Sequence, residues 1–337
     1  MGYKMAILGA TGLVGREMIS ILEEKDIPID NLNLYASDKS QGKSINFKGE
    51  ELTVNKLEPG VIADCDIYLS SLPGGVSERV LPEIAAKGKR IIIDNSSAFR
   101  MKSNIPLIVP EINGELAKDY QGIIANPNCS TIQLVMVLHP LVENFTLKEI
   151  TVTTLQSVSG SGQQALKALI TESNEYLNNK ERKTEHYAHP IAFNLLPAID
   201  YFHDNNYSNE EMKMVRETRK ILDLPGLSIN PTCIRVPVEF GHAEVCQVKI
   251  DQEVNLSRIK EILANQTKLK IVDNPQEDIY PMPIDILEDD SVLIGRLRKD
   301  LNSDYKFNFY CVANNIRKGA ALNAVQIAEK IMQVKLK

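Results

Sequence analysis

The sequence lacks several features, and each absence narrows the classes of protein to which it can belong. No run of 18 apolar residues occurs, so no transmembrane helix is expected. The cysteines are few and odd in number, scattered at positions 65, 129, 233, 246 and 311 without a C-x-x-C pair. This argues against a disulfide framework or a structural zinc site and favours a reducing cytoplasm. The formal net charge of −6 provides no field that would attract nucleic acid or an anionic membrane.

What is present is ordinary globular composition on a long chain. The 337 residues are 43% hydrophobic and 24% charged, which is enough for two domains with a sizeable core. The chain enters an apolar segment at Lys4–Leu8 and then a glycine-rich turn, without a basic region followed by a cleavable apolar one. We therefore expect no signal peptide.

The first motif is a glycine turn between an expected strand and an expected helix. Residues 4–8 predict a strand, Gly9-Ala10-Thr11-Gly12-Leu13-Val14-Gly15 forms the turn, and residues 16–24 have helical spacing. In this context the glycines let the backbone bend tightly and approach a pyrophosphate at the helix N-terminus. The alternative is a strand–helix turn that binds nothing. The position of the turn in a βα unit favours dinucleotide binding.

The remaining pattern divides into two parts. Up to residue 125, apolar runs at 66–69, 90–94, 106–110 and 122–125 alternate with helical segments such as 77–87, which is typical of a doubly wound parallel sheet covered on both faces. From residue 150 the runs 150–156, 229–238, 242–250 and 307–312 predict strands, and 150–156 alternates as in an antiparallel sheet. Helices are expected at 208–222, with Ser208 as N-cap and Glu211 at the capping-box position, at 256–265 and at 318–333. Residues 173–190 predict a polar surface loop or frayed helix. The fold class is therefore α/β: a Rossmann-type domain plus an α+β domain with a mixed or antiparallel sheet.

The segment after the strand at 33–36 bears on the cofactor. An NAD-preferring Rossmann domain usually has an acidic residue there, whereas this chain has Ser37, Asp38, Lys39 and Ser40. Two hydroxyls and Lys39 suit a 2′-phosphate, although the Asp38 carboxylate would repel it. The alternative for Lys39 is a solvated loop. The balance favours NADP.

Cys129 is the strongest candidate for chemistry. It follows a buried strand and the turn Asn126-Pro127-Asn128, and it opens an apolar helical segment. Backbone N–H groups and the helix dipole at such a position favour a thiolate over a thiol, and the site lies beyond a strand's carboxyl end. The alternative is that Cys129 is one more small buried hydrophobe.

Other candidates are weaker one by one. His242 begins a strand and could serve as a base, or it could be a structural histidine. Arg235, embedded among apolar residues, needs a carboxylate partner from a substrate or from the protein. Glu210 and Lys213 share a helix face, although such a pair is often a surface ion pair worth about 0.3 kcal/mol. His186 and His189 lie in a polar loop without a carboxylate cluster, so no metal site is expected. These patterns indicate a dinucleotide-dependent enzyme, with Cys129 as the candidate nucleophile.

Six segments in order resemble one family over essentially the full chain. They are the glycine turn, Asp94-Asn95-Ser96-Ser97-Ala98-Phe99-Arg100, Asn126-Pro127-Asn128-Cys129-Ser130-Thr131, His189-Pro190-Ile191-Ala192-Phe193-Asn194, Glu210-x-x-Lys213, and the Arg235-to-His242 spacing. Together they resemble aspartate-semialdehyde dehydrogenases. The cysteine segment separates the chain from the sister family, the N-acetyl-glutamyl-phosphate reductases, whose corresponding segment looks like His-Pro-Gly-Cys-Tyr.

The resemblance implies a reaction and a role for each matched position. L-aspartate 4-semialdehyde, phosphate and NADP would interconvert with 4-phospho-L-aspartate and NADPH. Cys129 would form a thioester, His242 would be its acid/base, and Gln156 would position the thioester. Substrate binding would fall to Arg235 for the α-carboxylate, Glu210 for the amino group, Arg100 and Lys213 for phosphate, with Asn128 beside the nucleophile. The cofactor would be lined by Gly9, Thr11, Gly12, Leu13, Val14, Ser37, Lys39, Ser40, Ser159, Gly160 and Asn315.

The resemblance also implies a domain plan and a cellular role. A cofactor-binding domain would comprise residues 1–128 and 316–337, and a catalytic and dimerisation domain residues 129–315. The enzyme would be a cytoplasmic homodimer acting in the biosynthesis of lysine and diaminopimelate, threonine, methionine and isoleucine. Two alternatives stay open: an N-acetyl-glutamyl-phosphate reductase-like enzyme and a non-catalytic nucleotide-binding paralogue. The second would be expected to lose Cys129 or His242, and both are present.

Overall fold

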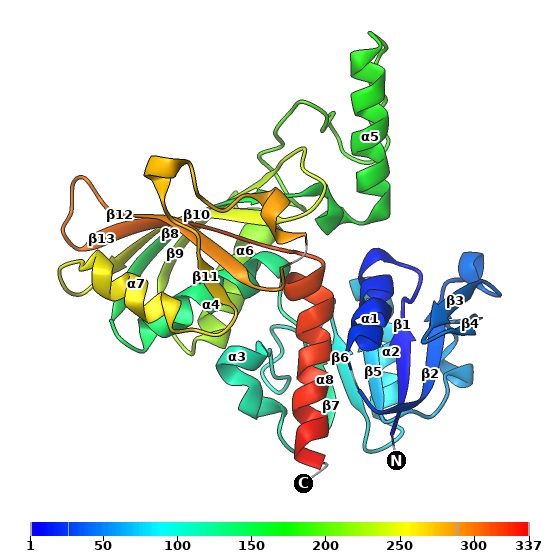
Figure 1. Cartoon of the computed structure of the whole chain (residues 1–337). Coiled ribbons are helices and arrows are strands. Elements are labelled where there is room, and N and C mark those ends of the chain that lie inside the picture. Colours follow the sequence, from blue (N-terminus) through cyan, green and yellow to red (C-terminus); the bar gives the residue numbers. More distant parts are fainter. Residues whose placement is uncertain (1, 26, 288, 336–337) are drawn as a thin grey trace. The chain divides into compact units, whose positions relative to one another are not determined.

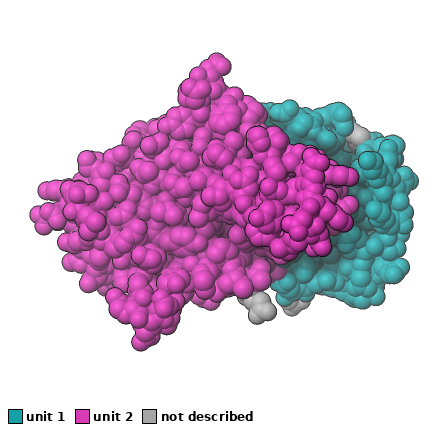
Figure 2. All heavy atoms as spheres, turned by 90° about the horizontal axis from the view of Figure 1, so that it is seen from above, with its two compact units in different colours: residues 1–128, 320–337 teal, residues 129–319 magenta. Residues whose placement is uncertain are grey.

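The chain folds into two compact units, drawn in different colours in Figure 2. The computed structural model describes residues 2–25, 27–287 and 289–335. Unit 1 comprises residues 1–128 and 320–337, and unit 2 comprises residues 129–319. The expected return of the chain to the first unit, at residue 316, lies four residues before this division. The assignment of cofactor binding to one unit and catalysis to the other stays a prediction at this point.

Unit 1 is built on a seven-stranded sheet with the order β3-β4-β2-β1-β5-β6-β7. The strands are β1 (Tyr3–Leu8), β2 (Ile29–Ala36), β3 (Ser44–Phe47), β4 (Glu50–Lys56), β5 (Ile67–Ser70), β6 (Ile91–Asp94) and β7 (Gly122–Ala125). All neighbours are parallel except β3 and β4, which form an antiparallel edge. The other six strands are parallel. Numbered among themselves in chain order, they have the Rossmann order 3-2-1-4-5-6, in which the direction of strand addition changes between β1 and β5. The predicted fold is confirmed.

Three helices cover this sheet: α1 (Leu13–Glu24), α2 (Gly74–Ala85) and α8 (Leu322–Lys335). Unit 1 also contains the single helical turn α3 (Pro110–Asn113). The apolar sides of α1 and α8 share one buried cluster with sheet residues such as Ile7 and Ile93. The helix α2 packs on β6 and β7 outside that cluster (Figure 1). The continuous apolar strands follow from this burial, because both faces of the sheet are covered.

The glycine turn lies between β1 and α1 at the point where the strand order reverses. Gly9 has φ +92°, a conformation that favours glycine, and a Cβ there would lie 2.6 Å from the Ser71 Oγ. A Cβ on Gly15, in the first turn of α1, would lie 2.2 Å from the Gly9 carbonyl oxygen. These two glycines therefore allow the tight turn and the close packing of helix on strand that a pyrophosphate site requires.

Unit 2 is built on a six-stranded mixed sheet with the order β11-β12-β13-β10-β8-β9. Its strands are β8 (Leu147–Gln156), β9 (Ser228–Arg235), β10 (His242–Ile250), β11 (Leu269–Ile271), β12 (Val292–Lys299) and β13 (Lys306–Ala313). The strand β8 pairs antiparallel with β10 and parallel with β9, so the sheet is mixed rather than purely antiparallel. The strands β9 and β10, consecutive in the chain, are thereby separated by β8.

Three helices pack against one face of this sheet: α4 (Cys129–Val142), α6 (Asn209–Ile221) and α7 (Leu256–Ala264). A fourth helix of the unit, α5 (Gln163–Leu177), extends away from the sheet (Figure 1). The helix α4 contacts β8, β10, β12 and β13 as well as α6 and α7, which explains why it is apolar nearly all round. The predicted capping box of α6 is confirmed: Ser208 Oγ accepts from the Glu211 N–H, and the Glu211 carboxylate accepts from the Ser208 N–H.

Several predicted elements are wrong or incomplete. The run 106–110 is not a strand: it makes one isolated bridge, Leu107 to Ala125, and then opens α3. Its two prolines have no N–H to donate to a ladder. The segment 173–177 belongs to the well-formed helix α5, and only the residues after it form a loop. The strands β3, β4, β11 and β12 were not predicted. Among the described residues, no helix is both long enough and apolar enough to cross a membrane.

Candidate active site

Cys129 is the first residue of α4, as predicted. The turn Asn126–Asn128 joins the end of β7 to the start of this helix, and the Cys129 side chain is half-buried. The backbone of Gly319, in the π-helical turn Arg317–Ala321, closes on the cysteine. A Cβ on Gly319 would lie 2.9 Å from the Cys129 Cβ. Gly319 therefore shapes the surroundings of the thiol, and no sequence signal had identified it.

Two chains of contacts place Cys129 and His242 at the same end of the unit 2 sheet. The Gly319 N–H donates to the Asn314 carbonyl oxygen, and Asn314 directly follows Ala313, which pairs with His242 across β13 and β10. Independently, Gln133 lies one helical turn beyond Cys129 on the same face of α4, and its amide lies beside the Glu244 carboxyl. Glu244 follows His242 by two residues and shares its face of β10. The expected nucleophile and the expected histidine are thus brought into one region.

His242 is fully buried and held through one ring nitrogen. Its Nδ1 accepts from the Ser157 N–H at 3.1 Å and lies 3.0 Å from the Ser157 Oγ. Its Nε2 has no hydrogen-bond partner among the described residues. Burial first, and then the positive charge of Arg235, lower the pKa of His242 to about 3, against a smaller opposing effect of Glu210. The ring is therefore neutral at physiological pH.

A buried carboxyl group lies next to this histidine on β10. Glu244 is fully buried, and burial raises its pKa well above the ordinary value. The Cys311 thiol donates to its Oε2 at 3.8 Å, while the Gln133 amide lies beside the carboxyl without closing a hydrogen bond of normal geometry. Burial therefore favours the neutral, protonated form of Glu244. The sequence had not singled it out.

Gln156, Glu210 and Lys213 form one hydrogen-bonded chain. The Gln156 Nε2 donates to the Glu210 Oε1 at 3.1 Å, and the Lys213 Nζ donates to the Glu210 Oε2 at 2.9 Å. Lys213 also donates to Asp200 Oδ2 at 3.1 Å. Glu210 is 5% exposed, so the alternative of a solvated surface pair is wrong. Asp200 was missed, since nothing in its loop sequence points to Lys213.

The charge of Lys213 is stabilised within this chain. Burial alone would lower its pKa. The Coulomb attraction and hydrogen bond of Glu210, followed by those of Asp200, outweigh burial and raise the pKa above the ordinary value. Lys213 is therefore a cation that already faces two carboxylates.

Arg235 ends β9 and is 4% exposed. Its Nη1 donates to the Ser157 carbonyl oxygen at 2.7 Å. In the part of the chain that the structure describes, no acidic side chain lies within ion-pair distance of its guanidinium. A buried arginine without an acidic partner is costly, which is why such a group is usually matched by a bound anion.

The loop after β8 connects several predicted residues. Asn315 Oδ1 accepts from the Gly241 N–H at 2.9 Å and from the hydroxyls of Ser157 and Ser159, while its Nδ2 donates to the Ser159 Oγ. Gly160 lies against the histidine, since a Cβ there would be 3.0 Å from His242 Nε2. The predicted cofactor residues Ser159, Gly160 and Asn315 thus adjoin His242. Ser157 was missed, although it lies directly after Gln156.

In unit 1 the predicted cofactor residues gather at the carboxyl ends of β1 and β2. The Thr11 hydroxyl donates to the Ser40 Oγ at 3.1 Å, which joins the glycine turn to the loop after β2. Ser37 and Lys39 are exposed beside it. Asp38 forms an ion pair with Lys56. The hydrogen bonds that Lys56 donates to Glu58 and Asp38 raise the pKa of Lys56. Lys56 lies on β4, outside this loop, and its positive charge offsets the unfavourable negative charge of Asp38.

Arg100 lies in the loop after β6, also in unit 1. Its Nε donates to the Asn126 carbonyl oxygen at 2.9 Å and its Nη2 to the Asn95 carbonyl oxygen at 2.7 Å. Two carbonyl groups at adjacent strand ends therefore orient a guanidinium that is only 7% exposed. Asn128, equally buried, lies at the end of the same turn as Asn126.

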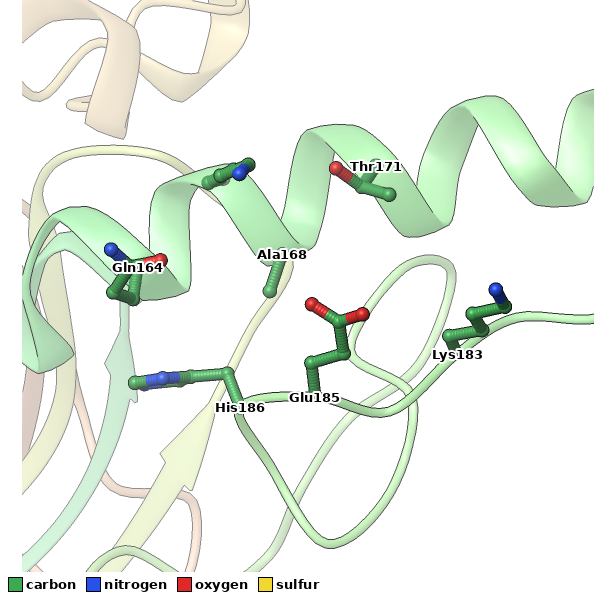
Figure 3. Close-up of a pocket in the computed structure, with 7 residues that line it drawn as sticks. Gln164, Ala168, Thr171, Lys183, Glu185 and His186 are labelled. Atoms are coloured by element: carbon green, nitrogen blue, oxygen red, sulfur yellow. The ribbon is translucent and has the colours of Figure 1, made fainter.

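A pocket in unit 2 lies between α5 and the segment that follows it. Figure 3 shows Glu185 and His186 facing the side of α5 that bears Gln164, Ala168 and Thr171. None of the predicted catalytic residues lines it. Among the described residues, no group of three or more histidine, cysteine or acidic side chains could hold a metal ion.

Comparison with known proteins supports the resemblance. Residues 4–120 match the family model "Semialdehyde dehydrogenase, NAD binding domain", and residues 138–318 match "Semialdehyde dehydrogenase, dimerisation domain". The chain is 44% identical to the aspartate-semialdehyde dehydrogenase of Aquifex aeolicus and 42% identical to that of Bacillus subtilis, covering 99% of both chains in each pair.

A solved structure agrees with the fold. The crystal structure of aspartate semialdehyde dehydrogenase II from Vibrio cholerae superimposes with a TM-score of 0.95 at 39% identity and covers 99% of each chain. The same protein is known in complex with ASA. Since the two family models and full-length relatives above 40% identity agree with this likeness, the chain belongs to the aspartate-semialdehyde dehydrogenase family of oxidoreductases.

Proposed function

We propose that this enzyme interconverts L-aspartate 4-semialdehyde, phosphate and NADP with 4-phospho-L-aspartate and NADPH through a thioester on Cys129. The observation that supports this best is the convergence of a cysteine at a helix start with a buried set of polar groups in unit 2. These groups are His242, Arg235 and the Gln156–Glu210–Lys213 chain. The membership of this chain in the aspartate-semialdehyde dehydrogenase family also supports this chemistry.

The helix start is the proposed source of the nucleophile. The Cys129 thiolate would add to the aldehyde carbon, and the N–H groups of the first turn of α4 favour negative charge there. NADP would supply the hydride acceptor, which leaves a thioester. Phosphate would then displace the thiolate to form the acyl phosphate. Covalent attachment divides one difficult step into two easier ones.

Arg235, Glu210 and Gln156 are the proposed groups for the amino acid part of the substrate. The guanidinium of Arg235 is buried and without an acidic partner in the described chain, which suits a substrate α-carboxylate. Glu210 would accept the amino group, and Gln156, hydrogen-bonded to Glu210, would position the thioester. A substrate with an acylated amino group would have no use for the Glu210 carboxylate.

Phosphate is proposed to bind to Arg100 and Lys213. Lys213 interacts with Glu210 and Asp200, and the carbonyl groups of Asn126 and Asn95 accept hydrogen bonds from Arg100. Replacement of either cation should raise the KM for phosphate, because a positive charge for the anion is lost.

The glycine turn fits the pyrophosphate of a dinucleotide, and the loop after β2 supports NADP. Gly9, Gly12, Leu13 and Val14 would lie along the pyrophosphate at the start of α1. Ser37, Lys39 and Ser40 would face the 2′-phosphate, and Lys56 reduces the repulsion from Asp38. Ser159, Gly160 and Asn315 are the proposed cofactor-binding residues of unit 2.

The open face of the unit 2 sheet is the proposed homodimer interface. Val245 on β10 is 41% exposed and pairs with Thr153 on one side and Tyr310 on the other. An exposed apolar side chain between two uncharged neighbours fits a surface that a partner covers. The match to a dimerisation domain model over residues 138–318 supports a second copy as that partner.

The test is phosphate-dependent reduction of NADP with L-aspartate 4-semialdehyde. Wild-type activity should require phosphate, and Cys129→Ser should lose it while it retains NADP binding, because only the nucleophile changes. The buried Cys246→Ser variant serves as the control for loss of a thiol elsewhere. Well-folded, NADP-binding wild-type protein without activity would refute the assignment. Activity with N-acetyl-glutamate semialdehyde instead would point to the sister family.

A further inference from the structure

A π-helical turn, Arg317–Ala321, follows β13 and leads into α8. The Gly319 N–H donates to the carbonyl oxygen of Asn314 at 2.9 Å, across five residues instead of the four of an α-helix. The Asn314 Oδ1 fixes the start of the same turn, because it accepts from the N–H groups of Ile316 and Arg317 at 3.0 Å each. Single π-helical turns of this kind occur frequently at functional sites.

Gly319 lies so close to the first residue of α4 that a side chain has no room. A Cβ on Gly319 would lie 2.9 Å from the Cys129 Cβ and 3.3 Å from the Cys129 Cα. Carbon atoms in normal contact are about 3.5–4.0 Å apart. Gly319 does not have a positive φ, so its backbone conformation is open to other residues and only the lack of space demands glycine. The turn is therefore a wall of backbone atoms against the predicted nucleophile.

An ion pair holds this turn. The Arg317 Nε donates to the Asp290 Oδ1 at 2.7 Å, and the Arg317 Nη2 donates to the Asp290 Oδ2 at 3.3 Å. Two N–H groups of the guanidinium thus engage both carboxylate oxygens, which is the strong and directional form of such a pair. The side chains of Arg317 and Asp290 are only 17% and 29% exposed, so solvent screens this pair less than a surface pair.

The sheet register brings Asp290 to the turn. The strand β12 starts two residues after Asp290 and pairs antiparallel with β13, with Leu293 opposite Val312. Residues that precede β12 therefore lie beside residues that follow β13. The neighbouring acid, Asp289, is directed elsewhere, because it pairs with Lys270 at 2.6 Å. Two consecutive acids of one loop thus have different partners, and only one of these partners belongs to the turn.

We propose that the turn Arg317–Ala321 fixes the position of the Cys129 sulfur. Gly319 is the contact that limits movement of the first turn of α4, and the ion pair of Arg317 with Asp290 keeps the turn in place. These three are positioning residues, since they act through Cys129. The proposal rests on the thioester chemistry proposed above. Misplacement of a reacting atom by about 1 Å can cost about 10²-fold in rate, so such a support has a kinetic effect.

Replacement of Gly319 by alanine tests the contact through activity. The new Cβ can reach a normal carbon–carbon distance only if Cys129 or the turn moves by at least about 0.6 Å. Gly319→Ala should therefore lower kcat for phosphate-dependent NADP reduction by about ten- to hundredfold while NADP binding is retained. Gly226→Ala, where a Cβ would meet open space, is the matched control and should retain kcat. Wild-type kcat in folded Gly319→Ala would overturn the proposal.

A stability cycle tests the same contact without any substrate. Gly319→Ala should lower the Tm by about 2–8 °C, because it overpacks this position. Cys129→Gly removes the Cβ that the alanine would meet, so the same replacement should lower the Tm much less in a Cys129→Gly background. If Gly319→Ala does not fold, the double variant should restore folding. An equal loss of Tm in both backgrounds, or a double variant that also fails to fold, would overturn the proposal.

A double-mutant cycle tests the ion pair. Asp290→Asn and Arg317→Gln each remove one charge and should each lower kcat by about three- to tenfold, with the KM for NADP retained. The double variant should be no slower than the slower single variant, because the pair can be broken only once. Asp289→Asn is the matched control and should leave kcat unchanged, since its partner Lys270 lies outside the turn. Losses that multiply in the double variant, or an equal loss in Asp289→Asn, would overturn the proposal.

The kinetic and thermal measurements separate this proposal from the proposed function. A wild-type protein that is inactive with L-aspartate 4-semialdehyde would refute the thioester function, while the Tm cycle would still decide whether Gly319 supports Cys129. An active enzyme whose Tm cycle shows no coupling would refute the support and leave the proposed function intact.

Discussion

Replacement of Glu244 by glutamine should change how the stability of the protein depends on pH. The folded protein keeps the buried carboxyl protonated, because burial raises its pKa well above 4.5, whereas the unfolded chain releases the proton near pH 4.5. Between the two pKa values the folded state therefore binds one proton more than the unfolded state. Stability from this group falls as pH rises, which is the reverse of the usual behaviour of a carboxylate.

The magnitude follows from this one-proton difference. Each pH unit crossed between the two pKa values costs the wild type about 1.4 kcal/mol, and glutamine has no proton to lose. The glutamine oxygen can accept from the Cys311 thiol, and its N–H₂ can face the Gln133 oxygen, which has no partner among the described residues. The stability of Glu244→Gln relative to wild type should therefore increase from pH 5 upwards by about 1.4 kcal/mol per unit until the folded carboxyl ionises.

Denaturant unfolding at pH 5, 6, 7 and 8 tests this, at one protein concentration because association between copies would make the unfolding midpoint depend on concentration. The chain has no tryptophan, so tyrosine fluorescence and far-UV circular dichroism are suitable probes. Glu253→Gln, at an exposed position, is the matched control and should show no pH-dependent difference. A difference between Glu244→Gln and wild type that is flat with pH, or that shrinks as pH rises, would refute the view that Glu244 is buried as a neutral acid.

Three further substitutions test other parts of the structure. Arg235→Leu should lower kcat/KM by about 30- to 1,000-fold, or about 2–4 kcal/mol, because a bound carboxylate loses its partner. The exposed control Arg258→Leu should have near-normal kcat/KM. Near-normal kcat/KM in Arg235→Leu would contradict the assignment. Lys39→Glu should raise the KM for NADP by about tenfold and leave that for NAD little changed, since a charge beside the 2′-phosphate is reversed. Lys43→Glu is the control. If it raised the KM for NADP as much as Lys39→Glu does, the effect would reflect the general electrostatic field and not a contact with the 2′-phosphate. Ser208→Ala should destabilise the protein by about 1 kcal/mol through loss of the α6 cap, measured as a shift in the unfolding midpoint, and an unchanged midpoint would argue against that role.

Local sequence patterns predicted the elements that are buried on all sides or have strong terminal signals. The β1–glycine–α1 unit, the start of α4 at Cys129 and the capping box of α6 were all expected and observed. Burial of both faces makes a strand continuously apolar, and a cap has a fixed spacing, so both signals are local. The strands β3 and β4 escaped prediction because an edge pair has polar residues on both faces.

The partners of the functional side chains could not be predicted in this way. Lys56 reaches Asp38 from a strand, β4, and Asp200, in the loop before α6, reaches Lys213 within that helix 13 positions later. Ser157 meets His242 only because β8 pairs with β10, which is a separation of 85 residues. The Ser157–His242 pair arises from sheet register, and register depends on the burial of whole strands rather than on the two residues that meet.

By itself the sequence determined which residue types could react and where helices and strands would present them. It specified a cysteine at a helix start, a glycine turn, and a histidine at the start of a strand. Tertiary structure alone decided the environment of these groups: complete burial and Arg235 lower the pKa of His242, Ser157 hydrogen-bonds to its Nδ1, and burial raises the pKa of Glu244. The physical reason is that reactivity depends on the local dielectric and on hydrogen-bond partners, which exist only after distant segments have packed together.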